Sequence, residues 1–136
     1  MAQASKKKSD KVRKWLLFLW LGFFLLNIMI VLYLFLDHWI EADNFKAAMK
    51  QLNAAYAPFV GVMLLFYWAG SGKVEKVKTG LPFKLAFAGS LLWNGMMLAF
   101  LVLLPIEAAL EHSKDIGALF SWLVAGAIGY YFARPG

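Results

Sequence analysis

The stretch WLLFLWLGFFLLNIMIVLYLFL, residues 15–36, decides the fold, because it contains no charged residue. At 1.5 Å per residue, a helix of this length spans about 33 Å, enough to cross a hydrocarbon core of about 30 Å. The apolar region of a secretory signal peptide is shorter, about 7–15 residues, and ends at a small-residue cleavage site. Here Asp37 and His38 follow, and no such site is present. The pattern therefore predicts a retained membrane-spanning helix.

The whole chain is too apolar for one soluble domain. Of its 136 residues, 62% are hydrophobic and 16% are charged, against about 45–50% and about 25% in soluble domains. A small domain buries only about two-thirds of its surface on folding, so lipid must be the solvent for much of this chain. The chain contains no cysteine, which excludes disulfides, thiolate metal sites and thiol catalysis.

Three further apolar segments have lengths typical of membrane spans, roughly 17–25 residues. Hydrocarbon offers the backbone no hydrogen-bonding partners, so isolated spans form helices. We expect an all-α, integral membrane four-helix bundle. Its predicted helices cover about residues 15–38, 54–70, 83–105 and 115–133.

The predicted bundle makes residues 15–136 a single transmembrane domain. Residues 1–14 are rich in lysine, and we expect them to form a basic, disordered cytoplasmic tail. Between the first two spans, residues 41–53 place Phe45, Met49 and Leu52 on one helical face. This spacing predicts a short amphipathic helix lying on the outer membrane surface.

Positive charges orient such bundles, because cytoplasmic segments carry the excess of lysine and arginine. With the N-terminus inside, the inner segments hold eleven of these residues and the outer segments three. An even number of spans places both termini in the cytoplasm, and we expect a multi-pass protein of a bacterial inner membrane. Cations beside a span attract anionic lipid by about 1 kcal/mol each. The expected lipid contacts are Lys6, Lys7, Lys8, Lys11, Arg13, Lys14, Lys73, Lys76 and Lys78.

Small residues four positions apart mark three of the predicted spans, and such stripes let membrane helices approach closely. They either fold one bundle or join subunits, and the sequence leaves both open. Asn27 and Asn94 lie at similar depths in parallel spans, which predicts a direct hydrogen bond between them. The candidate packing or pore residues are Asn27, Ala57, Gly61, Ser90, Asn94, Gly95, Ser121, Ala125 and Gly129.

The apolar runs of the predicted spans, residues 15–36, 54–70, 85–104 and 116–133, contain no Asp, Glu, Lys, Arg or His. Such groups usually mark ion, proton or substrate paths, so their absence argues against a proton-coupled carrier. The length and helix count resemble those of the small multidrug resistance transporters. Those proteins use a glutamate in the first span, and residues 16–36 contain none, so the likeness is one of size.

Catalytic patterns are also missing. No nucleophile elbow, phosphate loop or zinc-hydrolase spacing is present, so we expect no enzyme and no cofactor. Glu107, Glu111 and His112 either bind a divalent cation or serve as solvated interfacial charges. No aromatic residue is interleaved in the basic run before Trp15, and we expect lipid rather than nucleic acid as its partner.

Three functions remain. The first is a non-enzymatic accessory or structural subunit that acts through helix–helix assembly, in a homo-oligomer or a larger membrane complex. The second is an oligomeric channel or permeability effector with a pore lined by Asn27, Ser90, Asn94 and Ser121. The third is a carrier of a neutral solute. A liposome conductance assay separates the first two, because a structural subunit should not leak ions.

Overall fold

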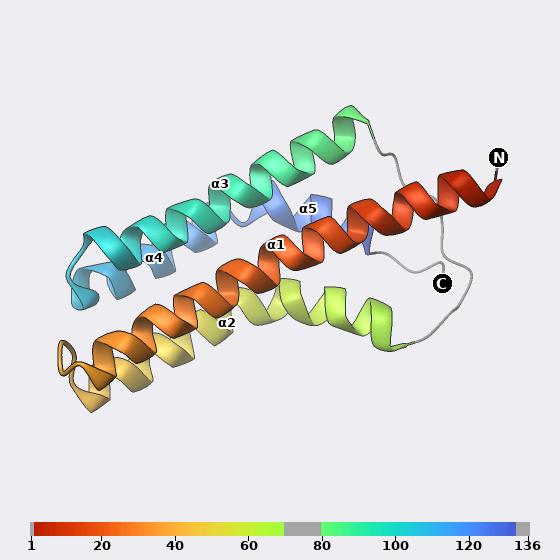
Figure 1. The fold of residues 1–136 in the computed structure, drawn as a ribbon. Helices are drawn as coiled ribbons and strands as arrows, with labels where there is room; N and C mark the ends of the chain where they lie inside the picture. Colours follow the sequence, from red (N-terminus) through yellow and green to blue (C-terminus); the bar gives the residue numbers. More distant parts are fainter. Residues whose placement is uncertain (1, 70–79, 133–136) are drawn as a thin grey trace.

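The computed structural model describes residues 2–69 and 80–132, which form helices and turns without a strand. The helices are α1 (Ala2–Leu36), α2 (Ala42–Trp68), α3 (Leu81–Leu103), α4 (Ile106–Leu119) and α5 (Trp122–Tyr131). Figure 1 shows α1 and α3 running in one direction and α2 in the opposite one. Helices α4 and α5 follow each other as one broken rod that packs against α2 and α3. The prediction of an all-α fold is confirmed.

Two helices of the described residues are long and apolar enough to cross a membrane: α1, over Lys7–Leu36, and α3. The other two predicted spans fall on α2, whose first half is charged, and on α4 and α5, which are shorter helices separated by a break. Residues 54–70 were predicted to form a separate span, but α2 begins at Ala42 and includes the segment predicted to lie on the membrane surface. The prediction of a separate surface helix is therefore wrong.

The fourth predicted helix, residues 115–133, also has different bounds. The structure forms α4 from Ile106, within the segment predicted to be a loop, and interrupts the rod at Phe120 and Ser121. The Ser121 amide turns back to the Ala118 carbonyl at 3.3 Å, and its hydroxyl donates to the same carbonyl at 2.8 Å. A hydroxyl that binds a nearby backbone carbonyl competes with the regular helical ladder.

The N-terminal segment differs from its prediction as well, because residues 2–14 continue α1 instead of forming a disordered tail. Lysine and arginine are good helix formers, and Lys14 pairs with Asp10 at 3.0 Å in the i, i+4 spacing that supports helices. Ser9, Val12 and Arg13 are buried against the rest of the bundle. Tertiary contacts thus order a segment whose composition suggested disorder.

The turn between α1 and α2 ends the first helix with a Schellman motif. The Trp39 amide donates to the Leu34 carbonyl at 2.8 Å and the His38 amide to the Phe35 carbonyl at 3.2 Å. This motif needs a left-handed residue after the helix, a position usually held by glycine. His38 holds it here with φ 60°. A non-glycine residue in this conformation carries a steric cost of about 1–2 kcal/mol.

Replacing His38 with glycine should therefore stabilise the fold. We expect His38→Gly to raise the free energy of unfolding by about 1 kcal/mol, because the left-handed conformation is free of steric cost for glycine. Thermal unfolding in detergent measures the change. His38→Ala is the control and should differ little from the parent, because alanine keeps the Cβ atom. A lower unfolding temperature for His38→Gly would contradict the role given to this turn.

The core is centred on aromatic rings from the three long helices. Trp20, Tyr56 and Trp93 are at most 2% exposed. The Trp20 ring lies 5.1 Å from Trp93 and 5.9 Å from Tyr56, measured between centroids. Such offset and edge-on pairs are favourable arrangements for aromatic side chains. The broken rod joins this cluster through Trp93, whose Nε1 donates to the Gly117 carbonyl of α4 at 3.1 Å.

Gly117 packs closely against α3, although it belongs to none of the predicted small-residue stripes. A Cβ atom there would lie 3.1 Å from the Met97 sulfur and 3.8 Å from the Trp93 ring, whereas one at Gly129 would meet nothing within 4 Å. We expect Gly117→Leu to cost about 1–3 kcal/mol, as overpacked cores do, and Gly129→Leu to leave the monomer unchanged. Thermal unfolding in a detergent that keeps the protein monomeric compares the two. An equal loss at both positions would refute this assignment.

Candidate interaction face on α2 and α4

The α1 and α3 side of the bundle presents large apolar side chains outward, and further ones, among them Leu65, Trp68 and Trp122, are exposed on α2 and α5. On α1, Phe18, Met29 and Tyr33 are 62–65% exposed. Exposed apolar surface of this extent marks a membrane or protein contact. We call this side the apolar face, and its main members on α1 and α3 are Phe18, Leu25, Met29, Leu32, Tyr33, Leu85, Leu92 and Val102.

Contacts between the helices show which residues share a height along the bundle. Gln51 of α2 donates through Nε2 to the Ser113 hydroxyl of α4 at 2.7 Å, and also to the Leu110 carbonyl. Val31 of α1 lines a cavity of about 20 Å³ together with Gln51 and Ser113. Because α2 and α4 run in the same direction (Figure 1), each α4 residue lies level with the α2 residue about 61 positions earlier.

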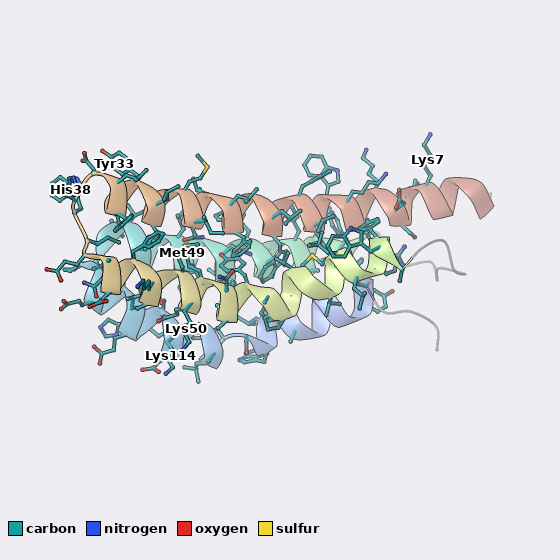
Figure 2. The ribbon with its side chains drawn as sticks, turned by 90° about the horizontal axis from the view of Figure 1, so that it is seen from below. Lys7, Tyr33, His38, Met49, Lys50 and Lys114 are labelled. Carbon is teal, nitrogen blue, oxygen red and sulfur yellow. The ribbon has the colours of Figure 1, made fainter. Side chains whose placement is uncertain are left out.

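The other side of the bundle carries charge. Figure 2 shows Lys50 of α2 and Lys114 of α4 close together on one edge, while Tyr33 points away from the bundle on the opposite edge. Residues three or four positions apart share one face of a helix, which places other exposed charged residues of α2 and α4 beside these two. We call this set the polar face, and its members are Asp43, Lys46, Lys50, Glu107, Glu111, Lys114 and Asp115.

Opposite charges occupy the same heights on the polar face. With an offset of about 61 positions, Lys46 lies level with Glu107, and Lys50 with Glu111, one helical turn further along. None of these residues forms a salt bridge within residues 7–69 and 80–132, where the ion pair found is Lys14–Asp10. The polar face thus presents Lys46 and Lys50 of α2 beside Glu107 and Glu111 of α4 without a salt bridge between them among the described residues.

The polar face lies beside the uncharged run of α1. Lys50 is next to Gln51 and therefore near the height of Val31, five residues or about 7–8 Å before the run ends at Leu36. Lys114 lies further along the bundle, toward the middle of that run. A bilayer covering residues 15–36 would place these charges at hydrocarbon depth, where each costs about 2.5–3.5 kcal/mol at the centre.

A groove between α2 and the broken rod adjoins the polar face. Its volume is about 380 Å³, and Lys114 and Gln51 are among the residues that line it. The rest of the lining consists mainly of small or apolar side chains, with Trp93 and Met97 from α3 among them. The small members from α2 and the rod are Ala54, Ala55, Pro58, Gly117, Ala118 and Ser121.

The predicted small-residue stripes are mostly on the outer surface. Ala57, Gly61, Ala125 and Gly129 are exposed, and a Cβ atom at Gly61, Gly95 or Gly129 would meet nothing within 4 Å. Packing within one chain therefore does not explain the stripes on α2 and α5. Of the two interpretations left open by the sequence, this placement favours contact with another molecule.

The polar residues predicted for a pore lie inside the core instead. Asn27, Ser90 and Asn94 are each 0% exposed. Asn27 Nδ2 donates to the Phe23 carbonyl at 2.7 Å and to the Tyr56 hydroxyl at 3.3 Å, while Asn94 Nδ2 donates to the Ser90 carbonyl at 2.7 Å. The predicted Asn27–Asn94 hydrogen bond is therefore wrong, although α1 and α3 are neighbours as predicted.

These core residues also leave polar atoms without partners. The Oδ1 atoms of Asn27 and Asn94 and the Ser90 hydroxyl are buried and accept or donate no hydrogen bond. Their complete burial within one chain means that they do not face a pore between copies. The fourth predicted pore residue, Ser121, is partly exposed in the groove.

The basic segment divides into exposed and buried members. Lys7, Lys8, Lys11 and Lys14 are exposed, which leaves the prediction of lipid contact open for them. The same prediction for Arg13 is wrong, because Arg13 is 3% exposed and its Nε donates to the Tyr131 carbonyl at 2.6 Å. The side chain of Lys6, together with Lys73, Lys76 and Lys78, lies outside the described residues.

Arg13 joins three helices at one end of the bundle. Its guanidinium lies 5.0 Å from the centre of the Phe66 ring of α2, and its hydrogen bond reaches α5. No local pattern in the sequence indicates this contact between residues 118 positions apart. Counting Arg13 as one more surface cation concealed its packing role.

The possible cation site at Glu107, Glu111 and His112 gains no further ligands from the described residues. Within the described residues, no three His, Asp or Glu side chains are close enough to hold a metal ion. Glu107, Glu111 and His112 are all exposed on α4.

No protein-family model matches the chain, and comparisons with curated proteins and with solved structures gave no significant match.

Removing the Arg13 side chain should weaken the bundle. We expect Arg13→Ala to lower the free energy of unfolding by about 2–3 kcal/mol, because it loses a charge-assisted hydrogen bond and a cation–π contact. Lys11→Ala, at an exposed neighbouring position, is the matched control and should change it by less than about 0.5 kcal/mol. Thermal unfolding in detergent measures both. Similar small effects at the two positions would contradict the assigned role of Arg13.

Proposed function

We propose that the chain is a non-enzymatic membrane subunit that acts by assembly, with its polar face docked onto another protein chain. The apolar face contacts lipid, and α2 and α4 contact the partner. The observation that carries this proposal is the height of Lys50 and Glu111, which lie outward beside an uncharged segment of α1. A protein partner can pair such charges, whereas lipid cannot.

In the proposed topology, α1, α2, α3 and the broken rod cross the membrane together, with both chain ends on the cytoplasmic side of a bacterial inner membrane. The start of α1 and the end of α5 lie at one end of the bundle, joined by the Arg13–Tyr131 hydrogen bond. Lys7, Lys11 and Lys14 are exposed at that end, next to Trp15, which is 55% exposed. Basic and aromatic residues in this order favour a cytoplasmic interface with anionic lipid.

A channel between copies is the second candidate, because the groove could hold water beside Lys114 and Ser121. The burial of Asn27, Ser90 and Asn94 removes most of the pore lining that the sequence suggested. Assembly accounts for the small exposed residues as well as for the charges, so it is the better supported of the two. Nothing in the described geometry favours a solute carrier.

Photo-crosslinking in native membranes tests the assembly. A photoreactive amino acid at Ala118, beside the groove, should give an adduct with a protein, because this side is covered by a partner. The same residue at Met29, on the apolar face, is the matched control and should give lipid adducts only. Mass spectrometry of the products separates the two kinds.

The channel makes a different prediction at the same position. In a cysteine-free chain, Ala118→Cys should react rapidly with a membrane-impermeant maleimide if the groove is water-filled, and slowly if a protein covers it. A lipid-only adduct at Ala118 would overturn the assembly proposal. Rapid maleimide labelling with ion conductance in liposomes would replace it with the channel.

A further inference from the structure

We propose that the partner on the polar face is a second copy of this chain, related by a two-fold axis parallel to the helices. This inference rests on the proposed function and names its partner. It starts from the unpaired charges: two lysines project from α2 and two glutamates from α4, at matching heights. A surface that carries both charge signs in this order is complementary to itself.

The two-fold axis follows from the heights. Two copies inserted in the same orientation can be related by a rotation about the membrane normal, which leaves every residue at its own height. Such a rotation places α2 of one copy against α4 of the other, in an isologous contact. Lys50 of each copy then faces Glu111 of the other, and Lys46 faces Glu107, so four ion pairs form from two kinds of contact.

A third pair of residues at matching heights agrees with this contact. Ala57 of α2 and Ala118 of α4 follow the same offset of about 61 positions, and both are exposed. They lie about two helical turns beyond the Lys50–Glu111 pairs and about three beyond the Lys46–Glu107 pairs. Small side chains at this height let the helices of two copies approach closely, while the charged side chains reach across the wider part of the contact.

Other occupants fit the polar face less well. An acyl chain could fill the groove beside Lys114, but it offers nothing to Glu111. Pairing within one chain would satisfy Lys50 and Glu111 without any partner, but no such salt bridge forms among the described residues. Lys114 has no acidic residue at its own height on α2, where Asn53 and Ala54 lie, so it takes no part in the proposed pairs.

Charge reversal in two separately tagged copies tests the contact. Cells coexpress two tagged chains, one tag is captured from mild detergent, and the other is quantified. When both copies carry K50E, we expect the captured copy to bring down at least tenfold less of the second copy than the parent does. The same loss is expected when both copies carry E111K. K50E and E111K together should recover within twofold of the parent, because each mixed contact then joins a lysine to a glutamate.

Coexpression of K50E with E111K distinguishes a contact between two copies from pairing within one chain. Pairing within one chain predicts that K50E and E111K fail to rescue each other, because each chain keeps two like charges. K84E, which reverses an exposed lysine on α3, is the matched control and should self-associate like the parent. The thermal unfolding of each variant, measured as a monomer, shows whether it is folded.

Disulfide formation gives a second measurement that does not alter the charges. One tagged copy carries Ala57→Cys and the other Ala118→Cys, and oxidation in membranes should join them into a mixed dimer. Phe18→Cys, on the apolar face, replaces Ala118→Cys as the control and should give at least tenfold less product. Absence of both the mixed dimer and the charge rescue overturns the two-fold contact.

The photo-crosslink at Ala118 separates this failure from that of the proposed function. An adduct with the mass of two copies supports the dimer. An adduct with a different protein keeps the assembly role and overturns the second copy as partner. A lipid-only adduct overturns both.

Discussion

In the proposed membrane setting, the cost of holding charge beside hydrocarbon is the constraint on which the rest of the arrangement depends. The uncharged run of α1 continues past the height of Lys50 and Glu111 to Leu36. A lysine can extend its ammonium toward the interface along its aliphatic stem, but a glutamate has a shorter side chain and needs a partner nearby. In the proposed assembly, the two faces of the bundle therefore meet different surroundings at the same height, lipid on the apolar face and a protein partner on the polar face.

The sequence predicted the apolar half of this arrangement better than the polar half. The segments that became α1 and α3 are long and uncharged, so their composition alone identified them. In contrast, residues 42–53 and 106–114 contain several charges, so the former were predicted to form a helix on the outer membrane surface and the latter a loop. The i, i+4 spacing of Glu107 and Glu111 was the available signal for a helix in the second segment, whereas nothing local indicated that the first helix continues into the next span.

The direction of each side chain around its helix was the other property that the sequence did not predict. Depth along parallel helices correctly made α1 and α3 neighbours, but each residue turns the helix by about 100°. Depth alone therefore could not show that Asn27 faces Tyr56 or that Asn94 turns back to the Ser90 carbonyl. Likewise, a small-residue stripe shows where two helices can approach, but not whether the second helix belongs to the same chain. Contacts such as Arg13–Tyr131 depend on the complete packing of the bundle.

The break between α4 and α5 separates two chemistries along the fourth rod. Residues 106–116 carry the acidic row, whereas Trp122–Tyr131 is apolar throughout and contains Gly126 and Gly129 with open space beside them. On α2 the same change occurs between Lys50 and the exposed Ala57 and Gly61. A partner docked on this side would meet ion pairs toward one end and close helix contacts toward the other. Charge would then set the register of the contact, and small residues would set its distance.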